Sequence, residues 1–181
     1  PSSGDPDDTD IPAGAGVTIL HDNLKPQATV QFPVSGQFYN SASLTFSSGT
    51  MSDASTGGTG VSDVKIILKK VQSPVRYSGS SLGTPWDPNP QRSTVTLHAS
   101  SWSVTLPTDL VTNTNYRIWV EATDGAGNSL SYTAGQLGAN TGGVFFVYDD
   151  DEPISVTTAP ANGALLSSQL SGIFGTTLDG A

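Results

Sequence analysis

The chain has 181 residues, of which 7 are Lys or Arg and 16 are Asp or Glu, so its formal net charge is −9. An acidic chain of this kind is a poor partner for nucleic acid and for anionic membrane surfaces. The absence of cysteine excludes a disulfide framework and thiolate chemistry, and no apolar run approaches the roughly 18 residues of a membrane-spanning helix.

The acidic residues are themselves unevenly distributed between the two types. Asp occurs 14 times and Glu only twice, and Asp favours turns and caps whereas Glu favours helices. With 20 Gly and 12 Pro, this composition predicts short strands joined by turns. We therefore expect an all-β fold, and a unit of this size can bury a core of its own.

Two similar segments organise the chain after residues 1–15, which are acidic, almost free of apolar side chains and expected to form a solvated linker. The segments are Gly16–Pro26 (GVTILHDNLKP) and Gly143–Pro153 (GVFFVYDDDEP). Each is a β-prone run followed by polar acceptors and a proline. Because the second follows the first by 127 residues, the sequence predicts a repeated structural unit.

The match continues beyond the second proline. The sequence P-V-S-G at 33–36 recurs at the same offset as P-A-N-G at 160–163, and Gly49–Ala54 recurs with a one-residue slip as Gly175–Ala181. This pattern predicts three parts of the chain. They are 1–23, a linker with the last strand of a preceding repeat; 24–150, a complete repeat; and 151–181, the first strands of a following repeat or a donated-strand segment.

Between the two segments, apolar residues alternate with polar ones, which is the period of a half-buried strand. The seven predicted strands span residues 28–32, 42–50, 61–71, 93–98, 102–106, 115–123 and 143–148. No amphipathic helix is predicted among them. Such a series is typical of an antiparallel β-sandwich. The insert 72–91 carries Pro85, Pro88 and Pro90, so we expect a hairpin or loop at a sheet edge there.

Two aromatic residues have predicted structural roles. Tyr116 begins the sixth strand shortly after Leu110, which is the position of a tyrosine corner, whose hydroxyl bonds an upstream backbone group. An ordinary half-buried tyrosine is the alternative. Trp102 is in phase with Val104 and Leu106 of its strand, so we expect it in the core.

The order of several short motifs resembles a known class of repeat. W-S-V-T-L-P at 102–107 is followed by Y-R-I-W-V-E at 116–121 and A-T-D-G-A-G-N at 122–128, with G-T-M-S-D-A at 49–54 before them. In this order they resemble the bacterial Ig-like tandem repeats of surface and adhesin-type proteins. The resemblance implies an Ig-like sandwich on the cell surface or outside the cell, serving as a stalk or spacer that is often calcium-stiffened at its linkers. It does not imply an enzyme, and the proline-rich insert 72–91 departs from it.

A calcium site is predicted at one end of such a sandwich. The start of the first strand and the loops after the second and sixth strands would lie together there, and Ca²⁺ binds six to eight oxygens from carboxylates, amides and carbonyls. Simple turn and cap roles are the alternative, since D-G and G-N sequences form turns in any β protein. The candidate ligands are Asp22, Asn23, Asp53, Asp124 and Asn128.

The repeat predicts an equivalent site at the next junction. It would use the run of three acids that follows the last strand, Asp149, Asp150 and Asp151, with Asp179 in the place of Asp53. A bound ion would relieve the repulsion within this run and restrict the angle between neighbouring units. Zinc is not expected, because the chain has no cysteine and only two histidines, far apart in sequence.

Catalysis is not expected either. His21 and His98 are the only histidines, and neither belongs to a nucleophile motif of the serine hydrolase kind. The sequence has no glycine-rich phosphate loop. Paired carboxylates of the glycosidase kind are the one catalytic arrangement that the Asp-rich composition leaves open.

The main alternative function is an adhesin module that binds carbohydrate or a host surface. Aromatic rings stack on sugars, so the candidates are Trp119, Tyr77 and Trp86. Trp119 is out of phase with the core residues of its strand, and we expect it on the outer face beside Ile67. That face is then either an exposed stripe or is covered by the insert 72–91 or by a neighbouring subunit.

The residues after Pro153 would leave apolar side chains on an open edge unless another strand covers them. Strands donated to another subunit would do so, and neighbouring repeats or copies of the chain are therefore the expected partners. The sequence thus predicts a structural extracellular unit that forms a rigid stalk or fibre through end-to-end junctions. We expect Ca²⁺ to stiffen these junctions or strand donation to polymerise them.

Overall fold

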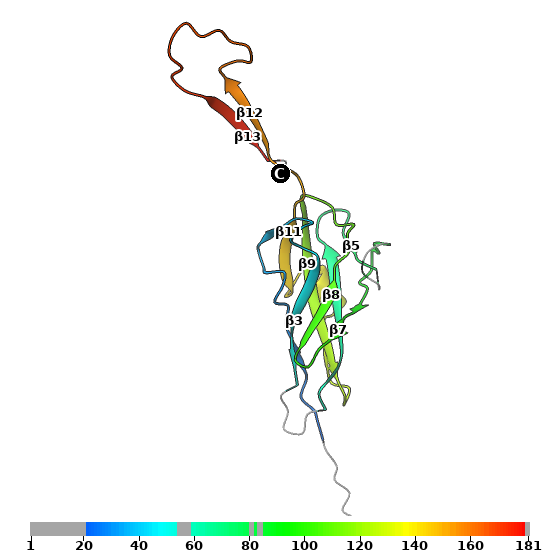
Figure 1. Cartoon of the computed structure of the whole chain (residues 1–181). Coiled ribbons are helices and arrows are strands. Elements are labelled where there is room, and N and C mark those ends of the chain that lie inside the picture. Colours follow the sequence, from blue (N-terminus) through cyan, green and yellow to red (C-terminus); the bar gives the residue numbers. More distant parts are fainter. Residues whose placement is uncertain (1–20, 54–58, 80–81, 83–84, 180–181) are drawn as a thin grey trace, which may run out of the picture.

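The computed structural model describes residues 21–53, 59–79, 82 and 85–179. These residues form an almost entirely β structure, with two sheets in one elongated body and a two-stranded hairpin that projects from one end (Figure 1). The expected linker 1–15 and the strand expected at 17–20 lie outside the described residues.

The first sheet has four antiparallel strands in the order β1-β3-β8-β7. Their bounds are β1 (Gln27–Ala28), β3 (Phe46–Ser52), β8 (Ser101–Thr105) and β7 (Thr96–Leu97). A β-bridge between Phe32 and Ser48 continues the pairing of β1 with β3.

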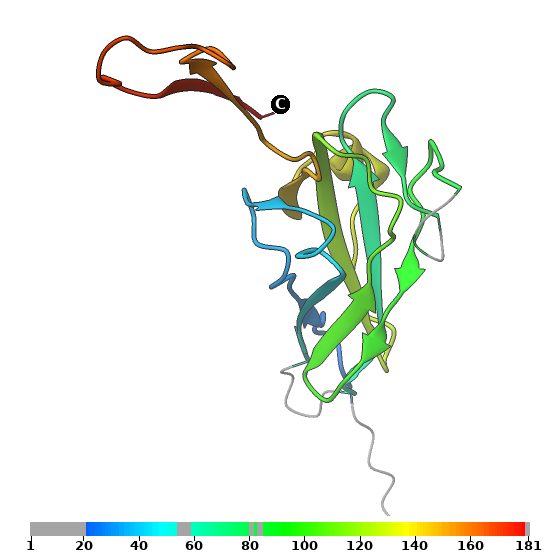
Figure 2. The ribbon, with the colours of Figure 1, turned by 45° about the horizontal axis from the view of Figure 1, so that its top comes forward.

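The second sheet has the order β2-β11-β9-β4-β5, and β10 and β6 pair with β9 and β4 respectively. Its bounds are β2 (Phe38–Tyr39), β11 (Val144–Tyr148), β9 (Thr114–Asp124), β4 (Val61–Lys70), β5 (Arg76–Tyr77), β10 (Ser129–Leu130) and β6 (Ser93–Thr94). The pair β2–β11 is parallel and the other pairs are antiparallel. The long strands β4 and β9 form the centre of this sheet (Figure 2).

The main hydrophobic core lies between the two sheets, and the all-β class expected from the sequence is confirmed. Trp102 from β8 and Tyr116 from β9 are fully buried in it. Alternate residues of β4 and β9 face this core because a strand turns successive side chains to opposite sides. The other buried members are Leu44, Met51, Val64, Ile66, Leu68, Leu106, Ile118, Val120, Ala122, Phe146 and Tyr148.

Three predicted strands differ from the structure, and the strand expected at 28–32 is reduced to β1 and the bridge at Phe32. The strand expected at 93–98 is divided, because β6 pairs with β4 in one sheet whereas β7 pairs with β8 in the other. Val95 lies between these pieces and packs against the core, so the chain crosses from one sheet to the other there. The strand expected at 42–50 begins only at Phe46, and that ring is exposed because it faces away from the buried Ser47, Gly49 and Met51.

A short helix that the sequence analysis did not predict covers the outer face of the second sheet. This helix, α1 (Ala134–Gly138), begins at a capping box in which the hydroxyl of Thr133 accepts from the backbone of Gln136 and the Gln136 side chain accepts from the backbone of Thr133. Leu137 of α1 packs with Ile67 and Trp119 in a second buried cluster. Consecutive residues of β4 and β9 are therefore buried on both faces.

The C-terminal hairpin stands apart from the sandwich. It consists of β12 (Ile154–Ala159) and β13 (Phe174–Leu178), which pair antiparallel with an irregularity between Thr157 and Ala159. The hairpin projects beyond β11 (Figures 1 and 2). Nearly all its residues are exposed, including Ile154 at 59% and Leu178 at 68%, so the sandwich leaves its apolar side chains uncovered.

Candidate functional site

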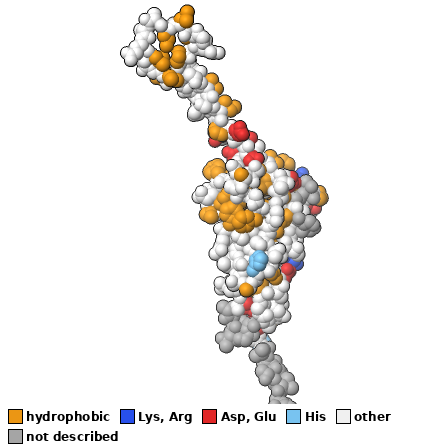
Figure 3. Space-filling view, viewed as in Figure 1, with side chains coloured by type: hydrophobic (Ala, Val, Ile, Leu, Met, Phe, Trp, Pro, Cys, Tyr) orange, Lys and Arg blue, Asp and Glu red, His pale blue; other side chains and the backbone are white. Residues whose placement is uncertain are grey.

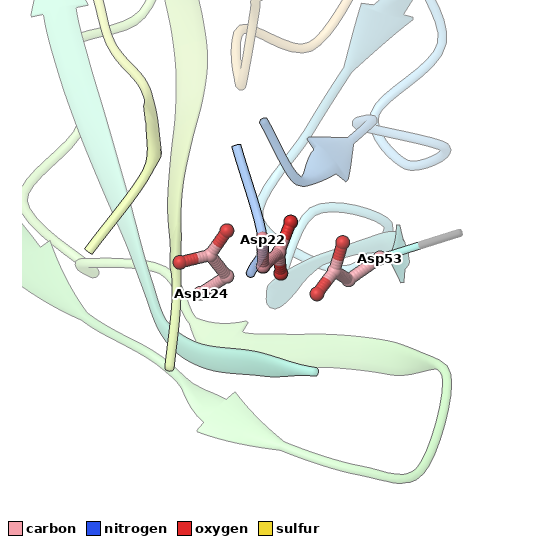
Figure 4. Close-up of side chains that lie close together, drawn as sticks. All are labelled: Asp22, Asp53 and Asp124. Carbon is pink, nitrogen blue, oxygen red and sulfur yellow. The ribbon is translucent and has the colours of Figure 1, made fainter. Parts of the chain in front are cut away.

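Three aspartates meet at the end of the sandwich opposite the hairpin. Asp22 lies in the N-terminal segment, Asp53 directly follows β3, and Asp124 is the last residue of β9. One carboxylate oxygen from each lies within 4.8 Å of the others. Their carboxylates share one small region of this end (Figure 4). The fold therefore brings together residues separated by up to about a hundred positions in the sequence.

Asp124 is the most fixed member of the trio, with only 2% of its surface exposed. One of its oxygens accepts the backbone N–H groups of Ala126 and Asn128 at 2.9 and 2.8 Å, and the other accepts the Asn128 side-chain amide at 2.9 Å. These bonds close the tight turn after β9. They are the turn role that the D-G and G-N sequences favour, and they also hold the carboxylate toward its two neighbours.

Asp22 and Asp53 are tied to the segment that precedes β4. Asp22 accepts the backbone N–H and the hydroxyl of Thr59, both at 3.2 Å, and Asp53 accepts the N–H of Gly60 at 2.9 Å. Thr59 also accepts the N–H of Ala126 at 2.9 Å. Thr59 was not among the predicted site residues, because a threonine in a loop carries no sequence signal that singles it out.

The donor set of this end suits a hard cation. Three carboxylates supply anionic oxygens of the kind that hard cations such as Ca²⁺ bind. The amide of Asn128 also donates to the carbonyl of Asp22 at 3.1 Å, and its other end is a neutral oxygen of the kind that Ca²⁺ accepts. Asn23 is exposed next to Asp22. Three carboxylates so close together repel one another unless a cation or protons reduce their charge.

The acidic run at the opposite end has a different arrangement. Asp149 accepts the Thr112 hydroxyl at 3.3 Å, Asp150 accepts the backbone and hydroxyl of Ser41 at 2.9 and 2.8 Å, and Asp151 accepts the Asn113 amide at 2.7 Å. The three carboxylates thus bind three separate partners, and the structure does not group them with one another or with Asp179. Bonds from Ser41 lower the pKa of Asp150. Acidic side chains mark this junction between sandwich and hairpin (Figure 3).

Two of the three aromatic residues proposed for sugar binding, Trp119 and Tyr77, are buried. Trp119 lies on the outer face of β9 as expected, and of the two alternatives for that face the structure has the covered one, because the exposed fraction of Trp119 is 0%. Leu137 of α1 and Tyr132 cover it together with Tyr77, which is itself only 5% exposed. The Trp119 indole donates to the carbonyl of Thr141 at 2.9 Å. Trp119 and Tyr77 therefore present no exposed ring to a sugar.

Trp86, the third candidate, closes the side of the core. Its ring is tilted against that of Tyr116 at 5.9 Å between centroids, and its indole donates to Asp109 at 2.9 Å. The hydroxyl of Tyr116 accepts the backbone N–H of Val111 at 2.8 Å, which is the geometry of a tyrosine corner. Burial is the main reason that the pKa of Tyr116 is raised to about 12.

A buried lysine fastens α1 to the second sheet. Lys69 of β4 has 2% of its surface exposed, and its Nζ donates to the carbonyl of Leu137 and to the side-chain oxygen of Asn140, both at 2.7 Å. The rings of Tyr77 and Trp119 lie 5.5 and 6.0 Å from the same nitrogen. Burial, and then the charge of Arg117, lower the pKa of Lys69. The amine satisfies a carbonyl at the end of α1, which is a structural role.

No protein-family model matches the chain, and no curated protein is significantly similar to it. Within the described residues, no helix is both long and apolar enough to cross a membrane.

Proposed function

We propose that the chain is a structural unit of an extracellular end-to-end array, a stalk or fibre built from Ig-like repeats, and that its two ends are the functional parts. The observation that carries this proposal is the hairpin β12–β13, which repeats the local structure of β1 and β3 outside the sandwich. The strand orders β1-β3-β8-β7 and β2-β11-β9-β4-β5 support an Ig-like description. Ig domains likewise pack a four-stranded antiparallel sheet against a second sheet of three or more strands.

The pairing of β1 with β3 and the pairing of β12 with β13 have the same register when residues are matched by the 127-residue repeat. Gln27 pairs with Ser52, and Ile154, which is 127 residues after Gln27, pairs with Leu178. Both strand pairs also have an irregularity at the same place. In the first pair, the N–H groups of Gln31 and Phe32 both donate to the carbonyl of Ser48. In the second pair, the register shifts after Thr157. The hairpin therefore has the form of the opening strands of a following unit.

The two junctions also share a local backbone motif. Asp22 accepts the N–H of Leu24 at 3.1 Å, and Asp149, its equivalent 127 residues later, accepts the N–H of Asp151 at 3.2 Å. In both places this turn leads from the end of one unit to the proline that enters the next. The same chain geometry at both ends would give successive units a fixed relation to one another.

We further propose that Ca²⁺ binds the trio Asp22, Asp53 and Asp124. Its charge would offset the repulsion of three carboxylates that lie within 4.8 Å of one another. Because Asp22 belongs to the segment that enters the unit, whereas Asp53 and Asp124 lie at the ends of β3 and β9, a shared ion would hold the entering segment against the sandwich. Asn128 and backbone carbonyls would supply further oxygens.

The array proposal is tested by completing the second unit. In a variant chain, residues 27–150 follow Pro153 directly, so that one junction joins two whole units. We expect small-angle scattering to show an extended particle about twice as long as one unit, more rigid in Ca²⁺ than in EDTA. A particle in which the two units collapse side by side, or a second unit that does not fold, would contradict the proposal. The native chain is the control for length.

A further inference from the structure

The first sheet contains a seat for an indole ring. Trp102 on β8 pairs with Gly49 on β3 and lies over it, so a Cβ at Gly49 would be 2.8 Å from the indole nitrogen. The indole N–H passes across this glycine and donates to the carbonyl of Thr29 at 3.1 Å. A glycine and the carbonyl beside it thus form the seat, and Trp102 is completely buried there.

The hairpin carries the same two components. Gly175 and Val156 occupy the positions of Gly49 and Thr29 under the repeat and the shared register. The carbonyl oxygen of Val156 lies 2.7 Å from the place that a Cβ at Gly175 would take, as the Thr29 carbonyl crowds the same side of Gly49. Gly175 is nevertheless exposed, so the second seat has no ring over it.

The open edge of the hairpin shows which strand is missing. In the first sheet β3 lies between β1 and β8, whereas β13 pairs with β12 alone in a two-stranded sheet. Since β12 takes the place of β1, the vacant side of β13 corresponds to the side of β3 that β8 occupies. A two-stranded hairpin is only marginally stable in water, and an exposed edge readily accepts a further strand.

We propose that Gly175 and the carbonyl of Val156 form the docking seat for a tryptophan carried by an antiparallel strand of the following repeat unit. This inference rests on the proposed array, and it names the contact that joins the hairpin to the rest of that unit. The register of β3 with β8 places the tryptophan opposite Gly175 and its small polar neighbours opposite Phe174 and Thr176. The indole N–H then donates to Val156 while its ring covers the glycine.

The test uses the full chain, labelled with ¹⁵N, and a synthetic peptide with the sequence of residues 99–107, ASSWSVTLP. We expect saturable chemical-shift changes in the amides of β12 and β13, centred on Gly175, while Gly49, whose seat Trp102 already fills, stays unchanged. A peptide with Trp102→Ala should bind at least about tenfold more weakly, because it lacks the indole contact and its hydrogen bond. This comparison leaves the hairpin itself unaltered.

The seat would be overturned by no saturable change at millimolar peptide, or by equal binding of the peptide with Trp102→Ala. Shifts confined to the sandwich would also count against it. The outcome is distinguishable from failure of the array. If the two-unit chain is extended but the peptide does not bind, the array stands and the seat falls. If the peptide binds but the two-unit chain collapses, the array falls.

Discussion

Replacing Tyr116 with phenylalanine tests how the crossover before β9 is held. The substitution keeps the buried ring and its stacking on Phe146 at 5.7 Å, but it removes the hydroxyl that accepts the N–H of Val111 at 2.8 Å. The bond is part-buried, and a backbone donor left without a partner away from water costs about 1–3 kcal/mol. For a domain of this size that is a fall of about 4–10 °C in melting temperature.

The matched control is Tyr39→Phe. The hydroxyl of Tyr39 accepts the N–H of Val34 at 2.8 Å with the same five-residue spacing, but in an exposed place where water can replace it. We expect Tyr39→Phe to lower the free energy of unfolding in urea by less than about 1 kcal/mol. Equal losses in the two variants would refute the reasoning, because burial would then not matter.

The pH dependence of Tyr116→Phe gives a second measurement. Burial raises the pKa of Tyr116 from 10.0 to about 12 in the folded state, so its contribution is fully present below pH 10 and is lost as the pH rises toward 12. A difference of about two pKa units corresponds to about 3 kcal/mol. The stability gap between wild type and Tyr116→Phe should therefore narrow between pH 10 and 12. A gap that stays constant over this range would contradict the assigned burial.

Three further predictions follow from the structure. Ca²⁺ at a hundredfold excess over Kd should stabilise the chain by about 2.7 kcal/mol relative to EDTA. Asp53→Asn should abolish the resulting shift in melting temperature, whereas the control Asp63→Asn should not. The absence of any shift in the wild-type chain would remove the metal proposal. Lys69→Met should lower the free energy of unfolding in urea by about 1–3 kcal/mol and speed hydrogen exchange in residues 134–143. Because the pKa of Lys69 is lowered, the wild type but not the variant should gain stability as pH rises toward 10.5. Unchanged hydrogen exchange would count against the role of Lys69 in fastening α1. Gly49→Ala should cost about 3 kcal/mol or more, since its Cβ would lie 1.7 Å from a carbonyl oxygen, whereas Gly138→Ala, with nothing within 4 Å, should be neutral in the same unfolding assay.

Local alternation predicted the central strands well because both sheets have a core side. Residues 61–71 and 115–123 were expected as strands, and β4 and β9 cover almost the same ranges. The meeting of Asp22, Asp53 and Asp124 could also be predicted, since it requires only that loops at one end of a sandwich lie together. These predictions depend on the period of the sequence and on chain direction, both of which can be read without side-chain detail.

The failures concern surfaces that only tertiary packing defines. The sequence left open whether the face that carries Trp119 is exposed or covered, because its cover comes from a short helix and from Tyr77, both distant in sequence. The capping box of Thr133 and Gln136 was the one local signal for that helix. The division of 93–98 between two sheets likewise has no periodic signature, because Val95 is compatible with one continuous strand and with two short strands in different sheets.

The parallel pair β2–β11 determines how the unit would respond to a pulling force. One terminus leaves the sandwich near β1 and the other leaves at the opposite end after β11, so tension between the two ends slides β2 and β11 past each other. The bonds that resist are those from Gly36 to Phe145, from Val147 to Gln37 and from Asp149 to Tyr39, at 2.7, 3.0 and 2.8 Å. All three lie across the direction of sliding and are loaded together, so none can break first and unzip the rest. Forced unfolding depends on the unfolding rate, and the shear arrangement of β2 and β11 would oppose extension of the unit.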